Sequence, residues 1–225
     1  MAAGVFVWLG GALFAASLAF SAWSYAAVFG RALPAAGWAP VAFNAALITL
    51  FALHHSLFAR ERVKAWLARR VPESLLRSAY VWIASLLLML VCAAWRPVGG
   101  ELYAITGIAS IAFAAVQLAG LWITARSAAR IDPLELAGIR PAAQTEGLQV
   151  AGPYHWVRHP LYLGWLLMVF GAAHMTGDRL AFAMITTCYL VVAIPWEERS
   201  LRRSFGEDYA RYTRAVRWRM IPFIY

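Results

Sequence analysis

Long apolar stretches alternate with short basic segments along most of the chain. A membrane-spanning helix needs about 20 mostly apolar residues, with about 17 to 25 tolerated. Six stretches meet this requirement, near residues 5–29, 38–58, 79–95, 102–125, 160–176 and 180–196. The last two are short and are joined only by residues 177–179, which predicts a tilted or partly re-entrant hairpin. The pattern therefore predicts an all-α polytopic membrane bundle of about six segments.

The periodicity changes after Trp196. At about 100° per residue counted from Leu201, one arc holds apolar side chains and the opposite side holds arginines. The apolar residues are Leu201, Phe205, Tyr209, Tyr212 and Val216, and the arginines are Arg199, Arg203, Arg214 and Arg217. This pattern predicts a basic amphipathic C-terminal helix, lying on the inner leaflet or against the bundle. Glu198 falls in the apolar arc and Glu197 near its edge, so an acid that faces the bundle needs a partner.

Composition agrees with a membrane protein. Hydrophobic residues make up 62% of the 225 positions, and the mean hydropathy is +0.62, which is too apolar for a soluble core. The first stretch lacks a basic N-terminal region, and its apolar run is about twice as long as that of a signal peptide, so we expect a retained span. Both cysteines, Cys92 and Cys188, fall inside predicted spans, where we expect free thiols without a metal role.

The net charge of +9 is distributed very unevenly. Six basic residues lie between the second and third stretches, four between the fourth and fifth, and seven after the sixth. The opposite side holds only Arg31, Arg96 and Arg179. This distribution follows the positive-inside rule and predicts that both termini lie on the cytoplasmic side of the membrane. The charge therefore indicates topology and attraction to membrane lipid rather than nucleic-acid binding.

An arginine and a histidine immediately precede the fifth stretch, in the segment GPYHWVRHPLYLGW. Pro160 is suited to the first turn of a helix, so Arg158 and His159 are expected at its N-terminal end. Free N–H groups there favour an anion, and the guanidinium of Arg158 is suited to a carboxylate. Tyr162 lies in the first turn, and Gly164 would let a ligand approach the backbone closely.

Glu197 and Glu198 follow the predicted hairpin and return to the same side of the membrane. If the two clusters face each other, one end of the site suits a carboxylate and the other an amine. Aromatic faces attract onium groups, and five aromatic residues lie nearby in the sequence: Tyr154, Trp156, Tyr162, Trp165 and Trp196. The alternative is that Arg158 and His159 are interfacial side chains that extend to water, and that the glutamates are merely solvated.

The segments GPYHWVRHPLYLG and EERSLRRSFGEDYARYTRAVRWRMIP resemble the isoprenylcysteine carboxyl methyltransferase and phospholipid methyltransferase superfamily. Its members are membrane enzymes that use S-adenosyl-L-methionine without a soluble Rossmann domain. The chain also has no Gly-x-Gly-x-x-Gly loop that could bind this cofactor in the soluble manner. The resemblance implies a cofactor site formed by Tyr154, Arg158, His159, Pro160, Tyr162, Gly164, Glu197 and Glu198.

The N-terminal half, around FALHHSLFARERVKAWLARRVPESLL, is similar to nurim and to bacterial methanethiol S-methyltransferases. It is more distantly similar to membrane proteins associated with nitric oxide reduction and carotene isomerisation. The resemblances imply a four-span nurim-like region over residues 1–125. They also imply a cofactor-binding methyltransferase region over residues 126–225, comprising a long loop, the hairpin and the amphipathic helix.

Polar residues inside a membrane are functional candidates. Asn44, His54, His55 and Gln117 are such residues, and the alternative for them is hydrogen bonding between helices. We expect His54, His55, Gln117 and Trp196 to contact the substrate. His159, Tyr162 and His55 are the catalytic candidates for deprotonating an acceptor.

One departure from the prenylcysteine enzymes bears on the substrate. Those enzymes carry an arginine about one turn before the acidic pair, whereas residues 193–196 here are apolar. The resemblance therefore implies methylation of a small thiol such as methanethiol, unless Arg203 or Arg126 supplies the charge. Methylation of an isoprenoid, prenylcysteine or lipid acceptor is the alternative enzyme function. A haem-binding isomerase and a non-catalytic nurim-like protein are the alternatives from other classes.

Overall fold

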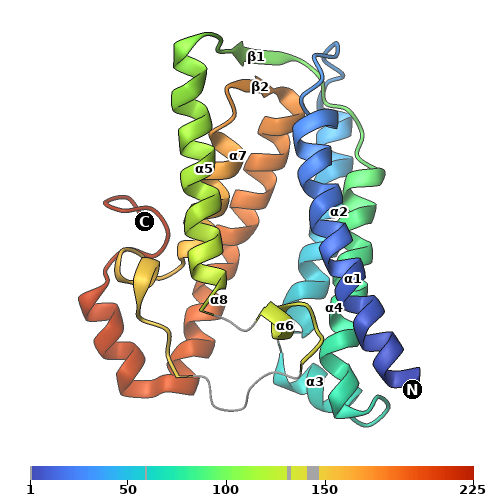
Figure 1. Cartoon of the computed structure of the whole chain (residues 1–225), viewed down its shortest axis with the longest axis vertical. Helices are drawn as coiled ribbons and strands as arrows, with labels where there is room; N and C mark the ends of the chain where they lie inside the picture. The colour runs from blue at the N-terminus through green and yellow to red at the C-terminus, as the bar shows by residue number, and fades with distance from the viewer. Residues whose placement is uncertain (1, 59, 131–132, 141–146) are drawn as a thin grey trace. The chain divides into compact units, whose positions relative to one another are not determined.

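Helices form most of the structure, a computed structural model that describes residues 2–58, 60–130, 133–140 and 147–225 (Figure 1). Within these residues, five helical segments are long and apolar enough to cross a membrane. They are α1 (Ala2–Trp23) with the π-helical turn η1 (Ser24–Val28), α2 (Trp38–Phe58), α4 (Glu73–Ala93), α5 (Ile108–Ala128) and α8 (Gly177–Ala215). The prediction of a helical polytopic membrane protein is confirmed.

Shorter elements connect these helices. They are α3 (Glu61–Leu67), β1 (Glu101–Ala104), α6 (Pro133–Leu136), the 3₁₀ turn η2 (Gly152–His155), α7 (Pro160–Phe170) and β2 (His174–Thr176). Strands β1 and β2 pair in a two-stranded sheet that the hydropathy pattern does not predict. The loop expected after α5 contains α6 and η2, while residues 131–132 and 141–146 within it lie outside the described residues.

The chain divides into two compact units. The first comprises Met1–Glu101, Asp132–Gln144 and Thr176–Asp178, and the second comprises Leu102–Ile131, Thr145–Met175 and Arg179–Tyr225. This division differs from the expected boundary at residue 126. Helix α5 belongs to the second unit because it packs along α7.

In the first unit, α4 packs against both α1 and α2 (Figure 1). Polar side chains fasten the loop that follows α4. The Asn44 side chain donates to the carbonyl of Arg96 at 2.7 Å and accepts from its N–H at 2.9 Å. The buried carboxylate of Asp178 accepts from the Trp95 indole and from the N–H groups of Val98 and Gly99. Asn44 therefore has the structural role that was the alternative to a functional one.

Helix α7 is shorter than the predicted fifth span and ends at Phe170. Its eleven residues rise only about 17 Å, against a hydrocarbon thickness of about 30 Å. An extended segment continues the chain and satisfies its backbone through pairing: Ile105 N–H donates to Ala173 O, and the Tyr103 hydroxyl to Ala172 O. The predicted turn at residues 177–179 is wrong, because these residues already form the start of α8.

Helix α8 runs from the last span directly into the expected amphipathic segment. The break comes later, at Gly206, where φ is +49° and the helix bends (Figure 1). Beyond the bend, Tyr209, Tyr212 and Val216 form a buried cluster against which Leu148 packs. The predicted apolar arc is confirmed. We expected it to face either the inner leaflet or the bundle, and Tyr209, Tyr212 and Val216 face protein.

Small residues allow α5 and α7 to approach closely. A Cβ built on Gly120 would lie 2.7 Å from the carbonyl oxygen of Gly164 and 2.9 Å from the N–H nitrogen of Met168. A Cβ on Gly164 would lie 2.7 Å from the carbonyl oxygen of Gly120. These neighbours are backbone atoms, which cannot rotate away. The expectation that Gly164 lets a ligand approach is therefore replaced by a packing role.

We expect Gly120→Ala to destabilise the protein by about 1–3 kcal/mol, because the added methyl group meets backbone on α7. The matched control is Gly4→Ala on α1, where no atom of a described residue lies within 4 Å of the added Cβ. Removing that glycine should be neutral or stabilise by about 0.5–1 kcal/mol. Unfolding midpoints in detergent micelles measure both variants, and equal effects of the same sign would contradict the packing role.

Candidate active site

The start of α7 and the middle of α8 bring the two predicted clusters together. Pro160 occupies the first turn of α7, as predicted, and His159 precedes it with a non-helical backbone. Glu197 and Glu198 come about five turns into α8, which runs antiparallel to α7. The Trp165 indole of α7 donates to Thr186, and the Tyr162 hydroxyl donates to Glu197, so the start of α7 lies beside the middle of α8. The prediction that the clusters face each other is confirmed.

A buried ion pair joins the two elements. The Arg158 Nε donates to Glu198 Oε1 at 2.7 Å, and their side chains are only 9% and 6% exposed. The same guanidinium donates through Nη1 to the carbonyls of Val216 and Arg217, at 2.9 and 2.8 Å. We expected Arg158 and the glutamates to bind opposite ends of one ligand. Arg158 and Glu198 instead neutralise each other, because an unpaired charge buried at this depth is costly.

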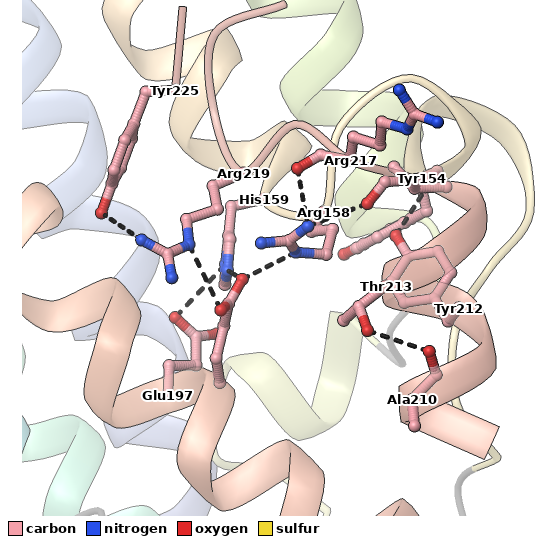
Figure 2. Close-up of polar contacts among 12 residues, drawn as sticks. Tyr154, Arg158, His159, Glu197, Ala210, Tyr212, Thr213, Arg217, Arg219 and Tyr225 are labelled. Carbon is pink, nitrogen blue, oxygen red and sulfur yellow. Dashed lines mark hydrogen bonds and ion pairs between the residues drawn. The ribbon is translucent and has the colours of Figure 1, made fainter. Parts of the chain in front are cut away.

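His159 lies between the two carboxylates (Figure 2). Its Nδ1 is 3.5 Å from Glu197 Oε2, and its Nε2 is 3.5 Å from Glu198 Oε1. The ring stacks on that of Tyr162 at 5.4 Å and 6°, and the Tyr162 hydroxyl donates to Glu197 Oε2 at 2.8 Å. The buried Nε2 makes no hydrogen bond to a described residue. It is therefore the nitrogen with capacity for another partner.

The adjacent glutamates differ in environment. The side chain of Glu198 is 6% exposed and also lies 3.3 Å from Arg219 Nε, whereas that of Glu197 is 43% exposed. Successive helical residues point about 100° apart, which explains how neighbours reach such different surroundings. Glu198 is thus a buried anion that joins the two elements, and Glu197 is the acid whose carboxylate is accessible from outside the cluster.

The C-terminal segment, residues 216–225, is the part of the site that sequence reasoning missed. Its carbonyls at Trp218 and Arg219 accept from the N–H groups of Arg158 and His159, at 2.9 and 2.7 Å. Arg219 also contacts Glu198 and donates to the Tyr225 hydroxyl at 3.2 Å (Figure 2). The sequence indicated only that this segment is basic, since no local spacing relates it to residue 158.

Arg219 is held beside Glu198 by charge. Burial alone would lower the pKa of its guanidinium, but the hydrogen bond to Tyr225 and the charge of Glu198 raise the pKa above its ordinary value. Arg219 therefore stays charged wherever Glu198 does. The segment also changes the expected anion site at the start of α7: the N–H of His159 donates to Arg219 and that of Tyr162 to His159, so neither is free.

The other aromatic candidates have separate positions. Tyr154 lies in η2, where its carbonyl accepts from the Tyr212 hydroxyl at 2.8 Å. Burial and the negative charge of Glu197 raise the pKa of its phenol, which keeps it a neutral donor. Trp165 donates to Thr186 at 3.1 Å. Trp196 is 63% exposed with the Arg199 guanidinium over its ring, so it lies on the surface of α8 rather than over the acids.

The polar residues proposed to contact substrate are divided between the units. Gln117, in the second, donates to the Met168 carbonyl at 2.8 Å, which gives it a helix-linking role. His54 and His55 are on α2 in the first unit. His55 shares a hydrogen bond with the Tyr80 hydroxyl, while the buried His54 ring stacks on Tyr80 at 5.3 Å and has no hydrogen bond to a described residue. Among the described residues, no group of three or more His, Cys, Asp or Glu is placed to hold a metal.

The sequence pattern of the phospholipid methyltransferase family matches residues 108–208. Methanethiol S-methyltransferase 2 of Bradyrhizobium diazoefficiens is 38% identical over 181 residues, which are 77% of this chain and 70% of that protein. Methanethiol S-methyltransferase of Crocosphaera subtropica is 38% identical over 187 residues, 79% of this chain and 73% of that protein. Human nurim is 30% identical over 183 residues, 73% of this chain and 69% of that protein. No solved structure gives a significant match.

We expect Arg158→Gln to destabilise the protein by about 3–5 kcal/mol, because it leaves the buried Glu198 carboxylate short of its main partner. The C-terminal segment should also become sensitive to protease, since two of its carbonyls lose their donor. Arg211→Gln is the control: it removes an exposed arginine paired with Asp208 and should cost about 0–1 kcal/mol. Similar unfolding free energies for the two variants would contradict the importance of the buried pair.

Proposed function

Because this chain belongs to the membrane methyltransferase family that includes the methanethiol S-methyltransferases, we propose that it transfers a methyl group from S-adenosyl-L-methionine to a small thiol such as methanethiol. The observation that carries the proposal is the cluster of His159, Tyr162 and Glu197 beside the Arg158–Glu198 pair. It lies where the family resemblance predicts a cofactor site. Methanethiol is the acceptor in the names of the Bradyrhizobium diazoefficiens and Crocosphaera subtropica relatives, of which this chain covers 70% and 73%.

The residues present are suited to this cofactor, which carries a sulfonium, an ammonium and a carboxylate. Glu197 offers a half-exposed carboxylate to one of the cations. The Tyr154 and Tyr162 rings are aromatic faces of the kind that attract onium groups. Arg158 is engaged with Glu198, so we assign it to holding the site rather than to the cofactor carboxylate. His159 Nε2, which makes no hydrogen bond to a described residue and lies 3.5 Å from Glu198 Oε1, is the remaining polar contact.

When bound, the cofactor supplies an electrophilic methyl group on a positively charged sulfur. The protein must then position the thiol in line and keep water away, which are effects of orientation and desolvation. A low-dielectric pocket would favour a transfer in which a thiolate and a sulfonium neutralise each other. The thiol must first lose its proton, and a neutral imidazole is a suitable acceptor.

We assign that proton to His159, whose Nε2 makes no hydrogen bond to a described residue, and we keep His55 and Tyr162 as further candidates. Tyr162 already donates its hydroxyl proton to Glu197, which suits it to positioning that acid. His55 bonds Tyr80 within the first unit. Its part in catalysis, and that of His54 in contacting the substrate, stay predictions from the sequence.

The apolar stretch before the acids supports an acceptor without a carboxylate. Ile194 is fully buried in a cluster with Leu166 and Met220. The helical turn that precedes Glu197 therefore presents an apolar surface to α7 and the C-terminal segment. A buried apolar wall offers nothing to balance a substrate carboxylate. The charge distribution further supports a site on the cytoplasmic side of the membrane. The bacterial relatives support a bacterial cytoplasmic membrane as its location.

Membranes containing the protein should transfer label from methyl-labelled cofactor to methanethiol and yield a volatile labelled thioether. The assay supplies methanethiol, longer alkyl thiols and a prenylcysteine analogue in parallel, with the headspace and the lipid extract counted separately. Label found solely in a carboxyl methyl ester, or solely in lipid, would contradict the thiol assignment and leave the methyltransferase class intact. Membranes lacking the protein provide the background.

Replacing Glu197 by Gln should weaken cofactor binding by about 10- to 100-fold, the effect of losing a charged hydrogen-bond partner of about 1.5–3 kcal/mol. The matched control is Glu207→Gln, an exposed acid on the same helix, which should leave the affinity unchanged. Equilibrium binding of labelled cofactor to the purified protein in detergent measures both. Equal affinities for the Glu197→Gln variant and the unmodified protein would remove Glu197 from the cofactor site.

A further inference from the structure

Large apolar side chains are exposed outside the membrane-spanning helices of the second unit. Phe223 is 84% exposed and Ile224 77%, both in the C-terminal segment, and Trp156, just after η2, is 50% exposed. Together with Trp122 near the end of α5, which is 52% exposed, we call these four residues the aromatic edge. Burying each such side chain is worth about 1.5–3 kcal/mol, so their exposure to water would be unfavourable.

The aromatic edge is continuous with the lipid-facing surface of α5. That helix exposes a row of apolar residues along its length: Ile108, Ile111, Val116, Leu118, Leu121 and Trp122. The ring of Trp122 stacks on that of Trp156 at 6.1 Å and 28°. Trp156 and Phe223 both line an open hollow of about 460 Å³ beside the C-terminal segment. The apolar surface therefore passes from a membrane helix onto segments that are not helical.

The backbone at Phe223 is held in an uncommon conformation. Its φ is +66°, the only positive φ at a non-glycine residue in the part of the chain that the structure describes. For a bulky side chain this conformation is costly and persists where the surroundings fix it. The neighbouring hydrogen bonds do so: the N–H groups of Arg219, Met220 and Ile221 all donate to the Tyr225 carbonyl. The turn thus holds Phe223 and Ile224 outward.

Two arginines lie beside the same surface. Arg217 lines the hollow, and Arg214 is exposed on the last turn of α8. Aromatic residues at the level of lipid headgroups and arginines beside them are the pattern that binds an anionic membrane surface. Among the residues that the structure describes, no acidic residue lines the hollow.

We propose that the aromatic edge docks into the headgroup region of an anionic lipid leaflet. The C-terminal segment lies along the bilayer surface, with Phe223 and Ile224 inserted and Arg217 at the phosphates. The same segment carries Arg219, whose Nε lies 3.3 Å from Glu198. The docked segment therefore separates the lipid surface from the cluster around Glu198. This docking does not depend on the proposed methyl transfer.

A fluorescent label on a single cysteine tests the docking in the full-length protein. Phe223→Cys is made in a Cys188→Ala background, where the remaining native thiol, Cys92, is only 6% exposed. Glu207→Cys, an exposed position on α8, is the matched control. Both proteins are labelled with an environment-sensitive dye and placed in vesicles of phosphatidylcholine alone or of equal parts phosphatidylcholine and phosphatidylglycerol.

The label at position 223 should lie about 5–10 Å below the surface of the anionic vesicles, quenched by a nitroxide lipid and protected from aqueous iodide. The label at position 207 should show the opposite behaviour. Arg217→Gln should reduce the depth at 223 toward that in phosphatidylcholine alone. Iodide access at 223 equal to that at 207 would overturn the proposal. Protection from both quenchers would also overturn it, because a protein surface or a second copy would then cover the edge. Equal depth in both vesicle types would overturn the role of anionic lipid.

Discussion

The buried ion pair between Arg158 and Glu198 is the constraint on which the site depends. Removing a carboxylate from water costs several kcal/mol, so Glu198 at 6% exposure requires close cations. Arg158 supplies one, and its remaining donors hold the carbonyls of Val216 and Arg217. One interaction thereby fixes the start of α7, the middle of α8 and the C-terminal segment. Arg219 completes the neutralisation from the third of these elements.

This arrangement gives two adjacent acids different tasks. Glu198 holds α7, α8 and the C-terminal segment together through its ion pairs. The side chain of Glu197 is 43% exposed, so its carboxylate is accessible. His159 and Tyr162 fix the position of Glu197 through their own contacts. The two glutamates therefore differ in their contacts: Glu198 links the elements through a buried ion pair, and Glu197 presents an exposed carboxylate beside them.

The membrane explains features of the second unit that would be unusual in water. Helix α7 ends early, and the extended chain after it pairs with the segment before α5, since backbone groups in lipid need internal partners. Glycines at positions 120 and 164 bring α5 and α7 to backbone contact, as is common where packing rather than the hydrophobic effect holds helices together. The exposed aromatic edge continues the same lipid-facing surface.

The sequence by itself determined the membrane class, the bounds of α2, the helix start at Pro160 and the meeting of the two polar clusters. Hydropathy, length and proline chemistry are local properties, and a returning hairpin must bring its ends together. Only the tertiary structure decided that Arg158 pairs with Glu198, that Gly164 packs on α5, and that Arg219 and Tyr225 join the site. Those contacts link residues that are 40 or more positions apart or lie in an irregular segment, where side-chain partners are chosen by the whole fold and no local period records them.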